Sequence, residues 1–230
     1  MSDIVAHLSK DGTVGLEMTE NNVKVHKLIS LDQFMAILKS NDESFELPLL
    51  PYGIRKIKKQ GRNTVVVIEH PEAVISEFKF GPGTTVYKDV PAPRSAWIIH
   101  LRENDSGDYT ILKVWILALD FPLMNEDQNA YEWPYPNHSI GYGPGVCWGN
   151  DPSFYQIKDK AQLHHLKSLY SIYFAARFNS DLGFKINMRD GGYGEGYLEA
   201  LSGKEVFQQS WLQPSNLTVR KAIDNMLARS

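Results

Sequence analysis

Four short apolar segments, each followed by turn-forming residues, constrain the fold of this chain more than any other feature of its sequence. They cover residues 64–69, 74–80, 96–101 and 110–119 and are rich in β-branched and aromatic residues. Gly, Pro, Asn and Asp lie between them and favour turns. The pattern predicts four consecutive antiparallel strands joined as a meander. Because residues 114–119 are all apolar, we expect the last strand at the sheet centre with both faces covered.

The N-terminal part of the chain predicts a hairpin and a helix. Apolar and polar residues alternate over 11–18 and 23–28, on either side of a turn-prone segment, which is typical of a β-hairpin. Ser30 followed by Gln33 matches a capping box, and the apolar spacing after it predicts a helix to about Lys39.

Two further helices are predicted near the C-terminus. Residues 157–179 carry a broad apolar face at helical spacing, so we expect the longest helix there. Ser215 follows Pro214 and is expected to start the last helix. The residues of this last helix expected to face the core are Val219, Ala222, Ile223, Met226 and Leu227.

Between these strands and helices, residues 119–154 show no helical pattern and contain repeated prolines. Structureless stretches of this length are uncommon in compact domains and are usually functional or disordered. Aromatic surface favours packing, and this stretch contains Trp133, Tyr135, Tyr142 and Trp148. We therefore interpret it as an ordered functional loop.

Composition excludes several classes of function. The chain has 24 Lys and Arg residues against 27 Asp and Glu residues, a formal net charge of −3, so no overall positive field attracts nucleic acid or anionic lipid. The longest apolar stretch, residues 114–119, is far shorter than the roughly 20 residues of a membrane-spanning helix. We expect no nucleic-acid partner and no membrane span. A single cysteine and the lack of an apolar leader favour the reducing cytoplasm.

That cysteine, Cys147, is the strongest candidate for chemistry. Glycines and prolines around it favour an exposed turn that leaves the sulfur accessible to a carbonyl electrophile. The amide of Asn137 could donate a hydrogen bond to the oxyanion formed in acyl transfer, a contribution of about 3 kcal/mol when well placed. His138 is a candidate general base, with a solvated loop residue as the alternative. The alternative for Cys147 is a buried structural thiol.

The sequence around Cys147 resembles a known active-site segment. Tyr135-Pro136-Asn137, a glycine-containing turn and then Gly145-Val146-Cys147-Trp148 are similar to the His-Pro-Asn and Gly-x-Ile-Cys-Leu segments of ubiquitin-conjugating enzymes. The proline-rich residues 90–93 resemble the turn before the third strand of that fold. Tyr135 replaces the histidine of the triplet, and the spacing from Asn137 to Cys147 is longer than in the eukaryotic enzymes.

A closer resemblance rests on Leu47-Pro48, Val65-Val66-Val67, Ala92-Pro93, Val146-Cys147-Trp148-Gly149-Asn150, Phe174 and Phe178-Asn179-Ser180. These segments together resemble PRTRC system protein B, a plasmid-associated prokaryotic ubiquitin-conjugating-like family, over about residues 45–182. The resemblance implies an α+β protein with a ubiquitin-conjugating-like fold, in which a four-stranded antiparallel meander is packed with helices. Residues 1–46 would form a hairpin-and-helix extension, residues 47–182 the core, and residues 183–230 a Gly-rich loop and C-terminal helix.

The resemblance also implies a function. Cys147 would accept the carboxyl terminus of a ubiquitin-like modifier as a thioester from a ThiF-like adenylating enzyme and pass it to a nucleophile. Asn137 would polarise the carbonyl, and His138 would assist. A JAB-type peptidase is a further expected partner, and neither a cofactor nor a metal ion is expected. The alternative is a catalytically inactive adaptor or structural protein of a mobile-element or phage assembly.

Three other features have simple interpretations. The basic run Arg55, Lys56, Lys58, Lys59 and Arg62 is either a solvated strand or a docking patch for an acidic partner. The adjacent residues His164 and His165 lie about 100° apart on a helix, so they cannot share one face as zinc ligands. The Gly-rich residues 191–196 lack the Lys-Ser/Thr of a phosphate loop, so we expect no nucleotide site.

Overall fold

The structure is a computed structural model of the whole chain. It describes residues 4–8, 13–20, 23–30, 53–138, 145–149, 151–179, 183–188 and 195–228. The helix expected after Ser30, the aromatic residue Tyr142 and most of the Gly-rich run lie outside the described residues.

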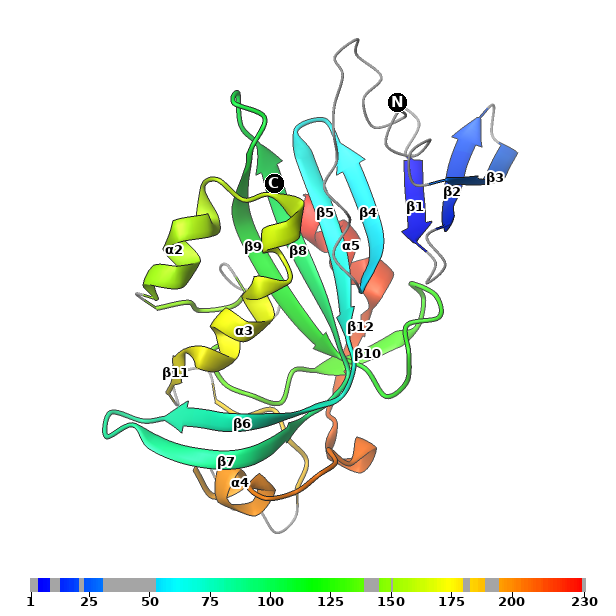
Figure 1. Cartoon of the computed structure of the whole chain (residues 1–230). Helices are drawn as coiled ribbons and strands as arrows, with labels where there is room; N and C mark the ends of the chain where they lie inside the picture. Colours follow the sequence, from blue (N-terminus) through cyan, green and yellow to red (C-terminus); the bar gives the residue numbers. More distant parts are fainter. Residues whose placement is uncertain are drawn as a thin grey trace.

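The largest unit of the described chain is one curled antiparallel sheet of nine strands (Figure 1). In order across the sheet these are β12 (Pro214–Thr218), β10 (Asn129–Glu132), β9 (Tyr109–Ala118), β8 (Ser95–Glu103), β5 (Asn63–His70), β4 (Ile54–Gln60), β1 (Ile4–Leu8), β2 (Thr13–Glu20) and β3 (Val23–Ser30). The antiparallel pairing of β2 with β3 confirms the predicted N-terminal hairpin.

A second, smaller sheet lies at one end of the large one (Figure 1). It contains the hairpin of β6 (Ala73–Phe80) and β7 (Thr85–Ala92), and the short strand β11 (Arg177–Phe178) pairs in parallel with β6. Because β6 lies in this second sheet, β5 pairs directly with β8 in the large one. The predicted meander of four consecutive strands is therefore wrong.

The burial of the strands explains this difference. Every residue of β5 between Thr64 and Glu69 is buried, and β8 is buried along most of its length, as expected for strands covered on both faces. In β6 the first five residues are exposed or partly buried, and only Phe78 and Phe80 are fully buried. It therefore does not take the place between β5 and β8, where both faces of the sheet are covered.

The described helices are short. They are α2 (Pro152–Lys158), α3 (Ser168–Ala175), α4 (Glu195–Leu201) and α5 (Val219–Ala228), with 3-10 turns at Leu163–His165 and Gln209–Trp211. None of them is both long and apolar enough to cross a membrane. The protein is mostly β, and the predicted α+β class with a ubiquitin-conjugating-like fold is wrong.

The single long helix predicted over residues 157–179 is wrong as well. The chain leaves α2 after Lys158 and returns to a helix only at Ser168. Between them, Ala161 exchanges two backbone hydrogen bonds with Tyr109 of β9, at 2.7 and 3.0 Å. These bonds extend the edge of the sheet and remove Ala161 from the helical pattern.

Apolar side chains pack on both faces of the large sheet. In β9, Val114 and Ile116 belong to one core, while Trp115 and Leu117 belong to the other. The two covered faces of this strand are confirmed. Helices α2 and α3 and the second sheet cover the first face, and α5 covers the second (Figure 1).

Helix α5 buries the five residues predicted to face the core. It begins at Val219, four residues later than the predicted start at Ser215, because residues 214–218 pair with β10 as strand β12. The hydroxyl of Thr218 accepts a hydrogen bond from the backbone N–H of Lys221 at 3.2 Å, which caps the first turn of the helix.

Candidate functional site

The cysteine segment lies along the part of the β9 edge that β10 leaves uncovered. The backbone N–H of Val146 donates to the carbonyl oxygen of Val114 at 2.9 Å. On the other side, the backbone N–H of Cys147 donates to the carbonyl oxygen of Asn137 at 2.8 Å. The segment is thus held from both sides, like a short extra strand between β9 and the loop that follows β10.

Gly145 permits this close approach to β9. Its φ of +86° is in the region that favours glycine. A Cβ atom at this position would lie 2.1 Å from the carbonyl oxygen of Val114 and 2.3 Å from Cδ1 of Trp115. The sequence therefore needs a glycine two residues before Cys147.

Cys147 is exposed while both of its neighbours are buried. Val146 packs into the first core, and Trp148 stacks on Phe154 of α2 with ring centroids 4.3 Å apart and an interplanar angle of 4°. The interpretation of Cys147 as a buried structural thiol is wrong. The neighbouring side chains anchor the backbone, and the thiol itself faces solvent.

Asn137 lies beside Cys147 through its backbone. Its φ is +61°, a left-handed conformation that asparagine tolerates better than most residues. Its side chain is 8% exposed. Nδ2 donates to the carbonyl oxygen of Arg177 at 3.2 Å, and Oδ1 accepts from the backbone N–H of Asn179 at 3.4 Å. The amide thus ties the cysteine loop to β11, and among the described residues no acceptor is bonded to the second N–H of Nδ2.

His138 anchors the same loop to β9. Its side chain is 3% exposed, and Nε2 accepts a hydrogen bond from the backbone N–H of Ile116 at 2.8 Å. Burial lowers the pKa of His138 to about 3, so the ring is neutral at pH 7. A neutral imidazole has one acceptor nitrogen, and Ile116 already uses it. The structure thus places this ring in the core, with its lone pair engaged.

Two buried tyrosines hold the residues before Asn137. Tyr173 of α3 accepts from Nε1 of Trp133 at 2.8 Å and donates to the carbonyl oxygen of Pro136 at 2.7 Å. The hydroxyl of Tyr135 donates to the carbonyl oxygen of Pro91. Burial raises the pKa of both tyrosines well above the usual range, so both hydroxyls keep their protons and act as donors.

Sequence reasoning missed the role of Tyr173. The pattern placed this residue on the apolar face of a long helix, and it lies 37 positions after the proline that it contacts. No local signal connects the two residues. The prolines of the loop were the one signal in the sequence that could have indicated such a contact. A buried proline carbonyl still needs a hydrogen-bond donor, which a distant side chain can supply.

The residues that follow Cys147 are held as well. The hydroxyl of Tyr155, in α2, donates to the carbonyl oxygen of Gly149 at 3.1 Å. The Tyr155 ring is about half exposed, and Nζ of Lys158 lies 5.7 Å from its centroid. The side chain of Asp151 caps α2 by accepting from the backbone N–H groups of Ser153 and Phe154. Cys147 therefore lies on a loop that is hydrogen-bonded on both sides of the thiol.

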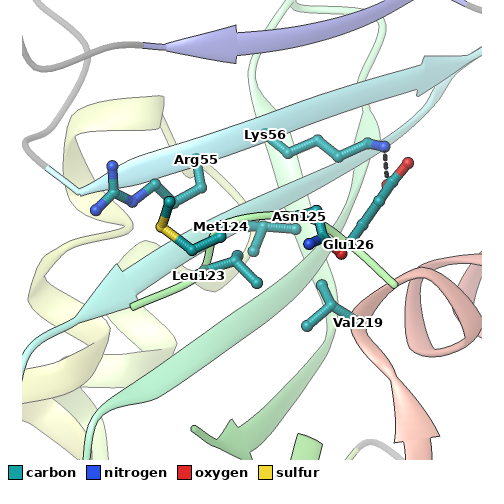
Figure 2. A pocket seen from close by; sticks show the side chains of 8 residues that line it. Arg55, Lys56, Leu123, Met124, Asn125, Glu126 and Val219 are labelled. Atoms are coloured by element: carbon teal, nitrogen blue, oxygen red, sulfur yellow. Dashed lines mark hydrogen bonds and ion pairs between the residues drawn. The ribbon is translucent and has the colours of Figure 1, made fainter. Parts of the chain in front are cut away.

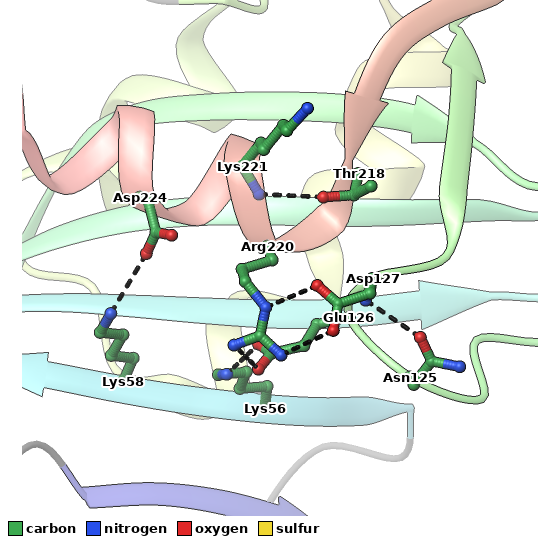
Figure 3. A network of polar contacts seen from close by, with 9 residues as sticks. All are labelled: Lys56, Lys58, Asn125, Glu126, Asp127, Thr218, Arg220, Lys221 and Asp224. Carbon is green, nitrogen blue, oxygen red and sulfur yellow. Dashed lines mark hydrogen bonds and ion pairs between the residues drawn. The ribbon is translucent and has the colours of Figure 1, made fainter.

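The basic run is neutralised within the chain. Each of its five cations forms an ion pair with a carboxylate from another segment (part of this network is shown in Figure 3). The pairs are Arg55–Glu69, Lys56–Glu126, Lys58–Asp224, Lys59–Glu103 and Arg62–Asp105. These pairs leave no excess positive charge for the acidic docking partner considered above.

The adjacent histidines are a local feature. The rings of His164 and His165 lie 4.1 Å apart in a T-shaped arrangement, and Nδ1 of His165 accepts from the backbone N–H of Gln162 at 3.2 Å. Within the part of the chain that the structure describes, no group of three or more His, Cys, Asp or Glu residues is arranged to hold a metal ion.

Comparison with known proteins adds no family to this description. No family model matches the sequence, and no curated protein or solved structure is significantly similar to it. The fold and the loop define the class by themselves: a mostly β protein with one exposed thiol on a loop anchored to the edge of its main sheet.

Proposed function

We propose that this protein is a thioester carrier in which Cys147 accepts the carboxyl terminus of a ubiquitin-like modifier and passes it to a nucleophile. The observation that carries the proposal is an exposed thiol whose own backbone N–H is bonded to Asn137, within a segment that resembles the active-site segment of ubiquitin-conjugating enzymes. The proposal depends on this segment and not on the fold, because the chain does not have the ubiquitin-conjugating-like architecture.

The chemistry proceeds in two transfers. The Cys147 thiolate attacks the carbonyl carbon of the modifier's acyl adenylate on a ThiF-like enzyme. A C–S bond forms, AMP leaves with the bonding electron pair, and the thiol proton passes to solvent. An acceptor amine then attacks the thioester, a C–N bond forms, the C–S bond breaks, and the thiol takes up the proton released by the amine. Such an activated donor needs no unusually acidic cysteine.

Anchoring of the loop supports this role. A nucleophile reacts faster when its backbone is held in the reactive geometry before the substrate arrives. Val114 and Asn137 hold the strand that carries Cys147, and Tyr155 holds the residues that follow it. The unused Nδ2–H of Asn137 is the proposed donor to the thioester oxygen. We assign His138 to anchoring, since its acceptor nitrogen is occupied.

The test is formation of an adduct in a reconstituted reaction. The purified protein is incubated with ATP, a ubiquitin-like modifier and its ThiF-like enzyme, after that enzyme has been shown to form the modifier's acyl adenylate. We expect an adduct that dithiothreitol removes, and none with Cys147→Ala. With Cys147→Ser, the adduct should be an oxygen ester that resists dithiothreitol. If the ThiF-like enzyme forms the acyl adenylate but the modifier is never transferred to the wild-type protein, the proposal is overturned.

A second candidate function is a noncatalytic adaptor. Several large apolar side chains are exposed, among them Phe121 at 48%, Met124 at 77% and Val206 at 60%. Such residues are typical of protein interaction surfaces when they cluster. Labelling with a maleimide separates the two candidates, because a Cys147 thiol that does not react in the native protein would favour the adaptor.

A further inference from the structure

A β-bulge in β4 brings two consecutive cations to one cavity. Ile54 pairs with Ile68 and Lys56 pairs with Val67, so Arg55 is an extra residue in the strand. A bulge of this kind redirects side chains that would otherwise point to opposite faces of the sheet. As a result, Arg55 and Lys56 both line the cavity beside Val67, and Figure 2 shows them extending towards its two ends.

The cavity has an apolar wall and an exposed lip. Its volume is about 160 Å³, close to that of an engineered protein cavity that binds benzene. Val67 of β5 and Val219 of α5 are almost fully buried in its wall, next to Leu123. Met124 is 77% exposed at the rim. A compact apolar group of the size of a benzene ring or a branched butyl group fits this space.

The ammonium group of Lys56 keeps unused hydrogen-bond donors in this cavity. Lys56 is 6% exposed, and Glu126 accepts one of its three N–H groups. Among the residues that the structure describes, no other acceptor is bonded to it. Burial lowers the pKa of Lys56, and the hydrogen bond to Glu126 opposes this shift. A nearby anion would satisfy the remaining donors and favour the charged ammonium.

The cations around the cavity are paired with carboxylates but keep hydrogen-bond donors that these pairs do not use. Glu126 is shared between two cations, because Arg220 also reaches it from α5, at 2.5 Å, as Figure 3 shows. Arg55 donates to Glu69 through Nε at 2.6 Å, and its side chain is 29% exposed. Among the described residues no acceptor is bonded to its two terminal nitrogens, whose geometry suits a planar carboxylate. Glu69, outside the lining, balances the charge of Arg55, so the cavity offers unused hydrogen-bond donors and not an excess of positive charge.

We propose that this cavity binds a small monocarboxylate with a compact apolar body, of the size of benzoate or a branched short-chain acid. The carboxylate contacts Arg55 or Lys56, and the apolar body packs against Val67, Leu123 and Val219. This site is separate from the cysteine loop. Its occupation does not depend on the proposed thioester chemistry.

The test uses sodium benzoate as the probe and benzyl alcohol as its neutral counterpart, with the full chain labelled for methyl NMR. We expect benzoate to shift the methyl signals of Val67, Leu123 and Val219 in a saturable manner. Benzyl alcohol should bind at least about tenfold more weakly, because it lacks the charge that strengthens hydrogen bonds to these cations. Equal binding of both probes, or shifts that do not saturate, would overturn the proposal.

Variants locate the site. Arg55→Gln and Lys56→Met should each weaken benzoate binding at least about fivefold, since each removes a charged donor. Arg62→Gln is the matched control, because its ion pair with Asp105 lies at the far end of the β4–β5 hairpin. Arg55→Gln leaves Glu69 paired with Arg94, so it decides the question if Lys56→Met does not fold. Unchanged benzoate binding in Arg55→Gln and in every folded Lys56→Met sample would contradict the proposal.

Discussion

The backbone N–H of Cys147 donates to the backbone carbonyl oxygen of Asn137 at 2.8 Å, so the residue with the exposed thiol is bonded directly to the residue ten positions before it. The side chain of Asn137 continues this connection to Arg177 and Asn179. The position of the thiol therefore depends on β11, a strand of the second sheet that lies far from it in the sequence.

Asn137→Ala should weaken both the fold and the reactivity of the thiol. The change removes two hydrogen bonds and places alanine at a φ of +61°, so we expect a loss of about 2–4 kcal/mol in the free energy of unfolding. Asn137→Gly also loses the two hydrogen bonds but has no backbone strain at this φ, so its free energy of unfolding should fall by less. Urea unfolding and the rate of maleimide labelling of Cys147 measure the two effects.

Asn216→Ala is the matched control for this prediction. Asn216 has a similar φ of +58° but is exposed, and it lies in β12, an edge strand of the large sheet. It should lose only about 1–2 kcal/mol from backbone strain and leave the labelling rate of Cys147 unchanged. Equal labelling rates in Asn137→Ala and the wild-type protein would show that Asn137 does not position the thiol.

Gly145→Ala should displace the cysteine loop from β9. The added methyl group meets the carbonyl oxygen of Val114 at 2.1 Å, so the segment must move and lose its hydrogen bond to β9. We expect a loss of about 2–4 kcal/mol in the free energy of unfolding. Gly149→Ala is the control, since its φ of +56° is similar but nothing lies within 4 Å of the added atom. Comparable unfolding midpoints in urea for the two variants would contradict the close approach.

The stability of the protein should fall as the pH falls from 7 to 5. Burial lowers the pKa of His138 to about 3 and the pKa of His70 and His100 to about 4, below the value near 6.5 in the unfolded chain. The unfolded state therefore binds more protons in this range. Each such histidine reduces the free energy of unfolding by up to about 1.4 kcal/mol per pH unit once the pH is below 6.5.

His138→Gln tests the contribution of one of these rings. The glutamine side chain carries an acceptor for the backbone N–H of Ile116 and does not titrate. Urea unfolding at several pH values should show a smaller slope between pH 5 and 6 than in the wild-type protein. An unchanged slope would mean that His138 takes up a proton in the folded state.

Removing the carboxylate from the ion pair between Lys56 and Glu126 should lower the free energy of unfolding far more than removing it from a neighbouring pair on the same strand. Their side chains are 7% and 11% exposed, so Glu126→Gln leaves a buried ammonium without its counter-charge and should cost about 3 kcal/mol. The control is Glu103→Gln, which breaks the more exposed pair with Lys59 and should change stability by less than about 1 kcal/mol. Chemical unfolding at pH 7 compares them, and equal losses would contradict the difference in burial.

Local patterns predicted the elements whose signals are local. The apolar segments at residues 64–69, 96–101 and 110–119 became β5, β8 and β9, and the inward face of α5 follows its helical spacing. The glycines and prolines around Cys147 indicated an exposed turn, and the thiol is exposed. In each case the deciding residues lie within a few positions of one another, where spacing records which side chains can share a face.

Contacts between distant segments had no such record. Nothing near β6 in the sequence indicates that this strand joins β7 and β11 in a second sheet, and nothing near Ala161 indicates its bonds to Tyr109. The buried partner of Pro136 and the carboxylates that neutralise the basic run are equally remote in the chain. The resemblance to ubiquitin-conjugating enzymes therefore predicted a four-stranded meander, and the observed strand pairing is different.

The amino-acid order alone determined several of the strands, β5, β6, β8 and β9 among them, the apolar face of the last helix and the exposure of the only thiol. Tertiary structure alone decided which strands share a sheet, which groups hold the thiol in place and which carboxylate meets each cation. The physical reason is that side-chain periodicity is set by neighbours along the chain. Backbone pairing and charge neutralisation are set by whichever partners the folded chain brings within hydrogen-bonding distance.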